Sequence, residues 1–231
     1  MDKLNMDPHI SKQFGMDLEE LKSRLLEMGG LVEKQVADAL RAVELADSAL
    51  AMKVLENEPK VDAMELVVDE EAALLIALRQ PAASDLRLVL AVSRVVRDIE
   101  RMGDEACKIA KMAIKLSEEG ASPRGNKELR HIGQNVQRIL NSSLDAFARF
   151  DAGAALEILP QDASVDMDYR SAVRELVTYM MEDPRSISRV MNMLWALKAV
   201  ERIGDHAKNI CEQVVYLVQG RDIRHTDTDE G

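Results

Sequence analysis

Apolar residues recur three and four positions apart along most of this chain. In one clear case, Val92, Val96, Ile99, Gly103 and Ala106 fall on a single face of a helix. No segment of six or more residues alternates convincingly between apolar and polar positions, and 11 Gly with 6 Pro are too few for many strands joined by turns. The pattern therefore predicts an all-α protein.

Six long helices account for this pattern. Asp47 and Asp151 are placed to cap two helix starts, and Ser84 is a candidate cap for a third. Pro184 suits the first turn of a helix. Because the connections are short, neighbouring helices must run antiparallel. The predicted helices span residues 9–45, 48–79, 84–117, 127–150, 152–182 and 186–219.

The chain contains an internal repeat. Residues 151–159 resemble residues 47–55, which lie 104 positions earlier. The segment Glu201-Arg-Ile-Gly-Asp205 likewise repeats Glu100-Arg-Met-Gly-Asp104 after 101 positions. We therefore predict two tandem, pseudo-symmetric three-helix bundles of long antiparallel helices. Their expected bounds are 1–118 for the first bundle, 119–126 for a linker, 127–220 for the second bundle and 221–231 for a polar tail.

Composition limits the class of protein. With 231 residues, 47% of them hydrophobic, the chain can bury one sizeable core or two small ones. Its net charge of −11 opposes binding to nucleic-acid phosphates or anionic lipids. No run of 18 apolar residues or signal-peptide pattern is present, and Cys107 and Cys211 form no metal or redox motif. A cytoplasmic protein is expected, with membrane contact only through partners.

The candidate chemistry lies in acidic pairs four residues apart. Glu100 with Asp104, and Glu201 with Asp205, each place two carboxylates on one helix face. Chance alone gives roughly seven such pairs in a chain with 41 acidic residues, so spacing is weak support by itself. Their recurrence at equivalent positions of both halves is far more specific.

Helix register brings further acids opposite these pairs. In an antiparallel hairpin, Glu100 should face the region of residue 63 and Glu201 the region of residue 166. The same counting brings Glu33 of the first helix near Asp62. The candidate metal ligands are therefore Glu33, Asp62, Glu65, Asp69, Glu100 and Asp104 in the first half, and Asp162, Asp166, Glu201 and Asp205 in the second.

Stacked like charges destabilise a hairpin, and a bound cation would offset them. Carboxylate oxygens, with few His nearby, favour Mg, Mn, Ca or Fe over Zn. The alternatives are solvated surface acids, or neutralisation by neighbouring Lys and Arg. The second half is poorer in acids, because Tyr169 and Val173 replace Glu65 and Asp69.

Two further sets of residues leave alternatives open. Gly103 and Gly204 fall in mid-helix, where each costs about 1 kcal/mol against Ala, so they indicate either close helix approach or a kink. The four His residues do not cluster, and a surface position is expected for each. Residues 79–87 form either a simple turn between helices or a partner-docking segment.

These motifs resemble those of the PhoU family over essentially the whole chain. The matching segments include RQPAASDLR at 79–87, DIERMGDEACKIAK at 98–111 and VERIGDHAKNICEQVVYLVQG at 200–220. The resemblance implies metal clusters held by the pairs Glu100/Asp104 and Glu201/Asp205, and a homodimer. It also implies a negative regulator of the phosphate-starvation (Pho) regulon and of phosphate uptake. Such a regulator is an adaptor between the phosphate ABC transporter ATPase and a sensor histidine kinase.

A different class of function fits the same carboxylates. A metal-dependent phosphatase or hydrolase would use cation-activated water against phosphate esters. No nucleophile motif or phosphate-cradling loop accompanies the acids in the sequence. We therefore expect a non-enzymatic regulator that binds divalent or iron-type metal ions and has no catalytic residues.

Overall fold

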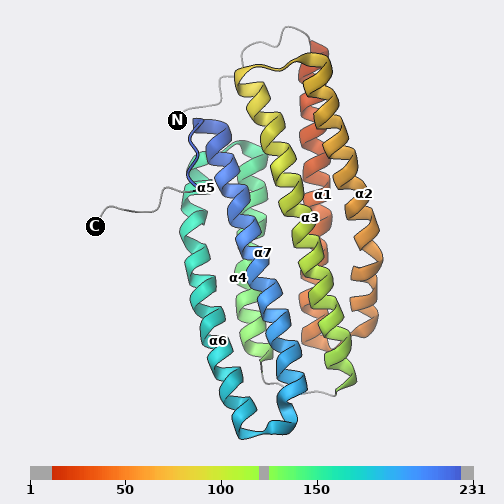
Figure 1. The fold of residues 1–231 in the computed structure, drawn as a ribbon, viewed down its shortest axis with the longest axis vertical. Coiled ribbons are helices and arrows are strands. Elements are labelled where there is room, and N and C mark those ends of the chain that lie inside the picture. Colours follow the sequence, from red (N-terminus) through yellow and green to blue (C-terminus); the bar gives the residue numbers. More distant parts are fainter. Residues whose placement is uncertain (1–11, 120–124, 225–231) are drawn as a thin grey trace, which may run out of the picture.

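Long antiparallel helices make up the described part of the chain, residues 12–119 and 125–224 of a computed structural model. The first bundle comprises α1 (Lys12–Leu45), α2 (Ser48–Arg79) and α3 (Ala83–Glu118). The second comprises α4 (Asn126–Arg149), α5 (Ala152–Ile158), α6 (Asp162–Glu182) and α7 (Ile187–Gln219), with 3-10 turns at Leu159–Gln161 and Pro184–Ser186. These ranges contain no strand, which confirms the all-α prediction (Figure 1). None of these helices is long and apolar enough to cross a membrane.

Most helix ends lie within one or two residues of their predicted positions. Asp47 accepts a hydrogen bond from the backbone N–H of Leu50 at 2.9 Å, and Asp151 accepts one from Ala154 at 3.0 Å. Ser84 is not a cap, because the position before α3 is Ala82, which makes no side-chain capping bond. The predicted helical residues 9–11, most of the linker and the tail beyond 224 lie outside the described residues.

Proline has different effects in the two outer helices. The predicted helix 152–182 is divided by the 3-10 turn Leu159–Gln161, which contains Pro160. Proline lacks the N–H that an α-helix uses, and its ring crowds the preceding turn. Pro59, by contrast, lies inside α2 without ending it. The segment predicted as one helix over 152–182 is therefore helical throughout, but a 3-10 turn that was not predicted from the sequence separates α5 from α6.

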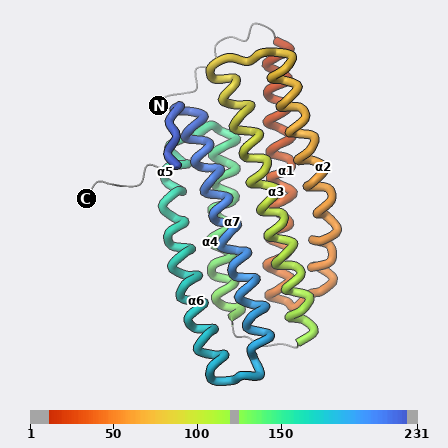
Figure 2. The backbone as a smooth tube through the Cα atoms, in the orientation of Figure 1, coloured from red at the N-terminus to blue at the C-terminus, as the bar shows by residue number. Residues whose placement is uncertain are grey.

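Four helices form the centre of the molecule. α3 packs against α7 and α1 packs against α4, and each of these pairs runs antiparallel (Figure 1). α2 covers α1 and α3 on one side, while α5 and α6 cover α4 and α7 on the other (Figure 2). Each acidic pair on α3 or α7 therefore belongs to a central helix that an outer helix, α2 or α6, covers.

The packing of α1 on α4 shows the pseudo-symmetry at the level of side chains. Gly29 lies against Leu144, and Gly133, its repeat equivalent, lies against Leu40, the equivalent of Leu144. A Cβ added at either glycine would come within 3.0 Å of a leucine methyl group. The two glycines therefore let the bundles approach closely at two equivalent points.

Candidate metal centres

The first acidic cluster lies where α2 packs on α3. Asp62, Glu65 and Asp69 come from α2, and Glu100 and Asp104 come from α3. Burial raises the pKa of Glu100, and the charges of Asp104, Glu65 and Asp62 raise it further. Burial and the charge of Asp69 likewise raise the pKa of Glu65. Glu100 and Glu65 therefore each lie close enough to other carboxylates of the cluster to be repelled by them.

Two arginines balance the first cluster only in part. The guanidinium of Arg97 lies 3.9 Å from Asp69, a long contact between partly exposed side chains. Arg97 and Arg101 both lower the pKa of Glu65, but burial and the neighbouring carboxylates outweigh them. Five carboxylates against two guanidinium groups leave the cluster with excess negative charge.

Glu33 does not join this cluster. Its carboxylate accepts a hydrogen bond from Asn141 Nδ2 of α4 at 2.6 Å. Gly29, on the same side of α1, also faces α4, whereas Arg24 and Gln35 turn towards α2. Counting along the hairpin gives the height of Glu33 on the helix axis but not its direction around the axis. The expectation that it lies near the α2 acids was wrong.

The second cluster, between α6 and α7, is neutralised from within. Lys198 Nζ donates to Glu201 Oε1 at 2.6 Å, and Lys208 Nζ donates to Asp162 Oδ2 at 3.2 Å. Lys198 also lies 5.5 Å from the centroid of the Tyr169 ring. The pairs that the sequence left open as an alternative to metal binding are thus present in this half.

Two carboxylates of the second cluster remain poorly satisfied. Burial raises the pKa of Asp205 to about 6, and the charges of Glu201, Asp162 and Asp166 add to the shift. The Oδ1 atom of Asp162 is buried and has no hydrogen-bond partner among the described residues. Such an atom is costly to leave unpaired, so it suits a bound cation or water.

Gly103 and Gly204 mark close helix approach rather than a kink. A Cβ added at Gly103 would lie 3.4 Å from Val61 and 3.6 Å from Val32. At Gly204 the equivalent valines of the second half would lie 3.8 and 3.6 Å away. α3 and α7 continue unbroken through both glycines. The two acidic pairs therefore sit on helices held close to both of their bundle partners.

The acidic clusters are open rather than closed cages. Within residues 12–119 and 125–224, no three His, Cys, Asp or Glu side chains converge closely enough to hold a metal ion. Cys107 and Cys211 are buried free thiols, and burial raises the pKa of each to about 12, so neither supplies a thiolate at neutral pH. The residues present fit an oxygen-ligated cation that keeps much of its water.

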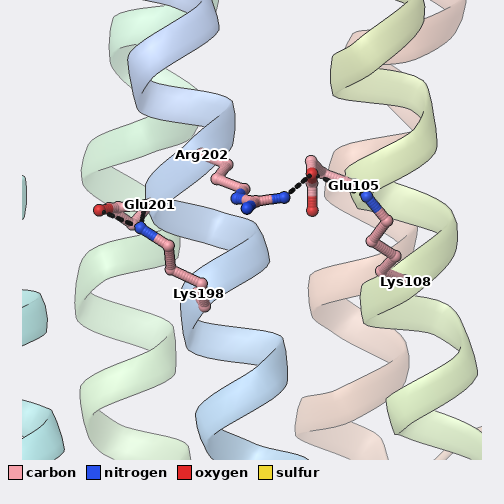
Figure 3. Close-up of polar contacts among 5 residues, drawn as sticks. All are labelled: Glu105, Lys108, Lys198, Glu201 and Arg202. Atoms are coloured by element: carbon pink, nitrogen blue, oxygen red, sulfur yellow. Dashed lines mark hydrogen bonds and ion pairs between the residues drawn. The ribbon is translucent and has the colours of Figure 1, made fainter.

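A polar network between α3 and α7 was not predicted. Asp98 Oδ1 lies 2.9 Å from His206 Nδ1 and accepts a hydrogen bond from Asn209 Nδ2 at 2.9 Å. Glu105 Oε1 accepts a hydrogen bond from Arg202 at 3.2 Å (Figure 3). Asp98 and Glu105 are seven residues apart, so both lie on one face of α3. This spacing is the sequence signal that could have indicated a polar contact with another helix.

The histidines differ in their positions. The side chain of His206 is only 17% exposed, so its expected surface position was wrong. His131 is exposed, with Nε2 3.3 Å from Asp168. His9 and His225 lie outside the described residues.

Comparison with known proteins covers both halves of the chain. The family model described as the PhoU domain matches residues 25–113 and 129–214. A "Phosphate-specific transport system accessory protein PhoU homolog" of Pseudomonas aeruginosa is 57% identical over 225 residues, covering 97% of this chain and 93% of the relative. The "Phosphate-specific transport system accessory protein PhoU" of Escherichia coli is 43% identical over 230 residues, covering 100% and 95%.

Two solved structures share the fold. PhoU from Pseudomonas aeruginosa superposes with a TM-score of 0.89 at 58% identity, covering 90% of this chain and 100% of that chain. The phosphate transport system regulatory protein PhoU from Streptococcus pneumoniae gives 0.85 at 30% identity, covering 91% and 99%. Both repeats and nearly the full length are shared, and the chain therefore belongs to the PhoU family.

Proposed function

We propose that this chain is a non-enzymatic regulatory accessory protein of phosphate-specific transport. The proposal is carried by relatives that have this name and match it over nearly its whole length at 43 and 57% identity. It acts as a negative regulator of the phosphate-starvation response, linking the phosphate ABC transporter ATPase to a sensor histidine kinase. Its long helices offer extended exposed surfaces to partner proteins.

An Escherichia coli strain that lacks its own PhoU tests this role. Expression of the chain should restore repression of a phosphate-starvation reporter in phosphate-rich medium, while the reporter stays active in the strain with an empty vector. Immunoblotting confirms that the chain accumulates. Full reporter activity in cells that contain the chain would overturn the proposal.

We also propose that the first acidic cluster binds a divalent or iron-type cation. Its support is the raised pKa of Glu100 and Glu65, which burial raises first and the neighbouring carboxylates raise further, since a bound cation would stabilise the charged forms. Titration calorimetry with Mn²⁺ on chelator-treated protein measures binding. The Glu100→Gln/Asp104→Asn variant should lose the tighter binding phase, and Glu33→Gln is the matched control. Equal binding by both variants would remove the first cluster as the site.

A phosphatase assay distinguishes a regulator from a metal-dependent phosphatase. Protein loaded with Mn²⁺ should release no phosphate from p-nitrophenyl phosphate above the buffer rate. Hydrolysis that Asp104→Asn abolishes would identify a metal-dependent enzyme instead.

The proposed regulator acts as a homodimer. α2 exposes Leu66, Leu74 and Leu78 by 70, 50 and 75%, an apolar surface of the kind that protein interfaces bury. In sedimentation velocity, Leu74→Glu/Leu78→Glu should be monomeric, whereas Met167→Glu/Met181→Glu on α6 should sediment like the original protein. A monomeric original protein at micromolar concentration would overturn the homodimer.

A further inference from the structure

A band of basic side chains runs along the face of α3 that its neighbouring helices leave uncovered. The chain has a net charge of −11, yet α3 and α7 together hold 11 Lys and Arg against 9 Asp and Glu. At about 100° per residue, six of the seven basic residues of α3 fall within about 80° of arc. They extend about 42 Å along the helix at 1.5 Å per residue. The six are Arg87, Arg94, Arg97, Arg101, Lys108 and Lys115.

α7 adds one cation to this band across the α3–α7 contact. Arg202 of α7 and Lys108 of α3 both donate to Glu105 Oε1, at 3.2 and 2.9 Å (Figure 3). Two cations thus share one carboxylate, which leaves excess positive charge at this point. The term basic face denotes the six α3 residues together with Arg202.

Much of this charge is not neutralised by the protein itself. Among the described ion pairs, none joins Lys115 or Arg101 to a carboxylate, and Arg97 has only its 3.9 Å contact with Asp69. Arg97 and Arg101 still lie in the field of the first acidic cluster, so their charge is partly offset, and that of Lys115 is not. Arg94 donates to the neutral amide of Gln213. The basic face therefore presents a positive field on an otherwise acidic molecule.

The second half shows that the fold does not require such a band. α7 is the repeat equivalent of α3, and it keeps a basic residue at only two of the seven basic positions. Trp195 stands at the position of Arg94 and Tyr216 at that of Lys115. The band therefore calls for an explanation other than helix packing.

Exposed apolar side chains border the basic face. Ile187, Met191 and Trp195 are four residues apart on α7, and Trp195, the only tryptophan of the chain, is 60% exposed. The positions of Ser188 and Arg202 flank that of Trp195 around the helix. Ser188 bonds to Glu119, directly after α3, and Arg202 bonds to Glu105 of α3. An exposed aromatic residue at the border of a charged surface is typical of the centre of a protein interface.

Acidic residues beside the basic face limit how wide an anionic partner can be before it meets like charges. Glu100 and Asp104 border the basic face on its α2 side, so a bilayer or a DNA duplex laid on it would meet carboxylates as well. A single helix, about 10–12 Å across, fits within the band. We propose that the basic face docks an acidic amphipathic helix of a partner protein, whose apolar residues cover Trp195. This inference rests on the adaptor role proposed above.

Co-sedimentation with membrane vesicles that contain the organism's phosphate transporter tests the inference. The variant Arg101→Gln/Lys108→Gln/Lys115→Gln removes three charges of the basic face while keeping good helix formers. The control Lys34→Gln/Lys53→Gln/Lys60→Gln changes the net charge equally at exposed sites of α1 and α2. The basic-face variant should bind at least tenfold more weakly, and the control within twofold of the original protein. Circular dichroism confirms that both variants fold.

Each other outcome has a distinct meaning. Equal binding by the two triple variants would overturn the basic face as the docking site and leave the adaptor role intact. Failure of the original protein to bind these vesicles above transporter-free vesicles would overturn both proposals. If the original protein binds protein-free vesicles with 30% anionic lipid as strongly as it binds transporter-containing vesicles, the basic face binds a lipid surface and not an acidic helix.

Discussion

Two lysines distinguish the acidic clusters at the scale of single residues. Lys198 and Lys208 bond directly to Glu201 and Asp162, whereas the first cluster has only the long contact of Arg97. A lysine that already neutralises a carboxylate competes with an added cation for the same charge. The second cluster should therefore bind cations more weakly than the first.

Lys198→Met should strengthen cation binding at the second cluster about tenfold. The substitution leaves Glu201 without its partner, and tenfold in affinity corresponds to about 1.4 kcal/mol of lost competition. Calorimetry with Mn²⁺ in a Glu100→Gln/Asp104→Asn background isolates this cluster, and Lys53→Met on α2 is the control. Unchanged affinity in Lys198→Met would contradict the competition.

Asp205 should make stability depend on pH. Its pKa is about 6 in the folded chain against an ordinary value of 3.8, so the folded state binds more protons between these pH values. Stability should therefore fall as the pH rises from 4 to 7, by on the order of 1 kcal/mol once solvent screening is allowed for. Urea unfolding of Asp205→Asn in chelator should show a smaller fall. An identical pH dependence in both proteins would exclude Asp205 as its source.

The sequence could place carboxylates along the helix axes but not the direction of every side chain. Glu100 and Asp62 meet because both the height and the direction on their helices agree. Glu33 has the right height and faces α4 instead. The bond from Lys198 back to Glu201 depends on a rotamer choice, which residue spacing does not determine.

At the scale of elements, two glycines control how closely α1 approaches α4. Gly29 and Gly133 each face a leucine of the opposite helix, while Gly30 has nothing within 4 Å of an added Cβ. A larger side chain should therefore have different effects at the adjacent positions Gly29 and Gly30. Helix propensity acts alone at Gly30, and packing dominates at Gly29.

Gly29→Leu should destabilise the chain by about 1–3 kcal/mol, because the new side chain overlaps Leu144 and separates α1 from α4. Gly133→Leu should have a similar effect through Leu40, its pseudo-symmetric contact. Gly30→Ala should instead stabilise by up to about 1 kcal/mol. Chemical denaturation measures all three. Destabilisation by Gly30→Ala as large as that by Gly29→Leu would contradict the packing account.

Helix number and most helix ends followed from capping and periodicity, but one break did not. Asp47 and Asp151 act through local hydrogen bonds that any sequence with this spacing can form. Pro160 divides α5 from α6, while Pro59 remains inside α2. Proline disfavours an α-helix at both sites, so the residue type alone does not predict which of the two helices is interrupted.

At the scale of the whole molecule, the two bundles share one interior. α1 packs on α4 and α3 on α7, so the central helices bury side chains against both repeats. The polar network of Asp98, His206 and Asn209 lies within this contact. Neither bundle can open without exposing part of the other, and the two should therefore unfold together.

Asp98→Ala tests this coupling. The substitution leaves His206 and Asn209 without their acceptor at the α3–α7 contact, and we expect a loss of about 2–4 kcal/mol of unfolding free energy. Circular dichroism follows all helices, while Trp195 fluorescence follows α7 alone. The two midpoints should coincide in both proteins and shift together. Asp145→Ala, at an exposed pair with Arg149, should leave them unchanged. Two separate midpoints, with only the fluorescence transition shifted, would show that the bundles unfold independently.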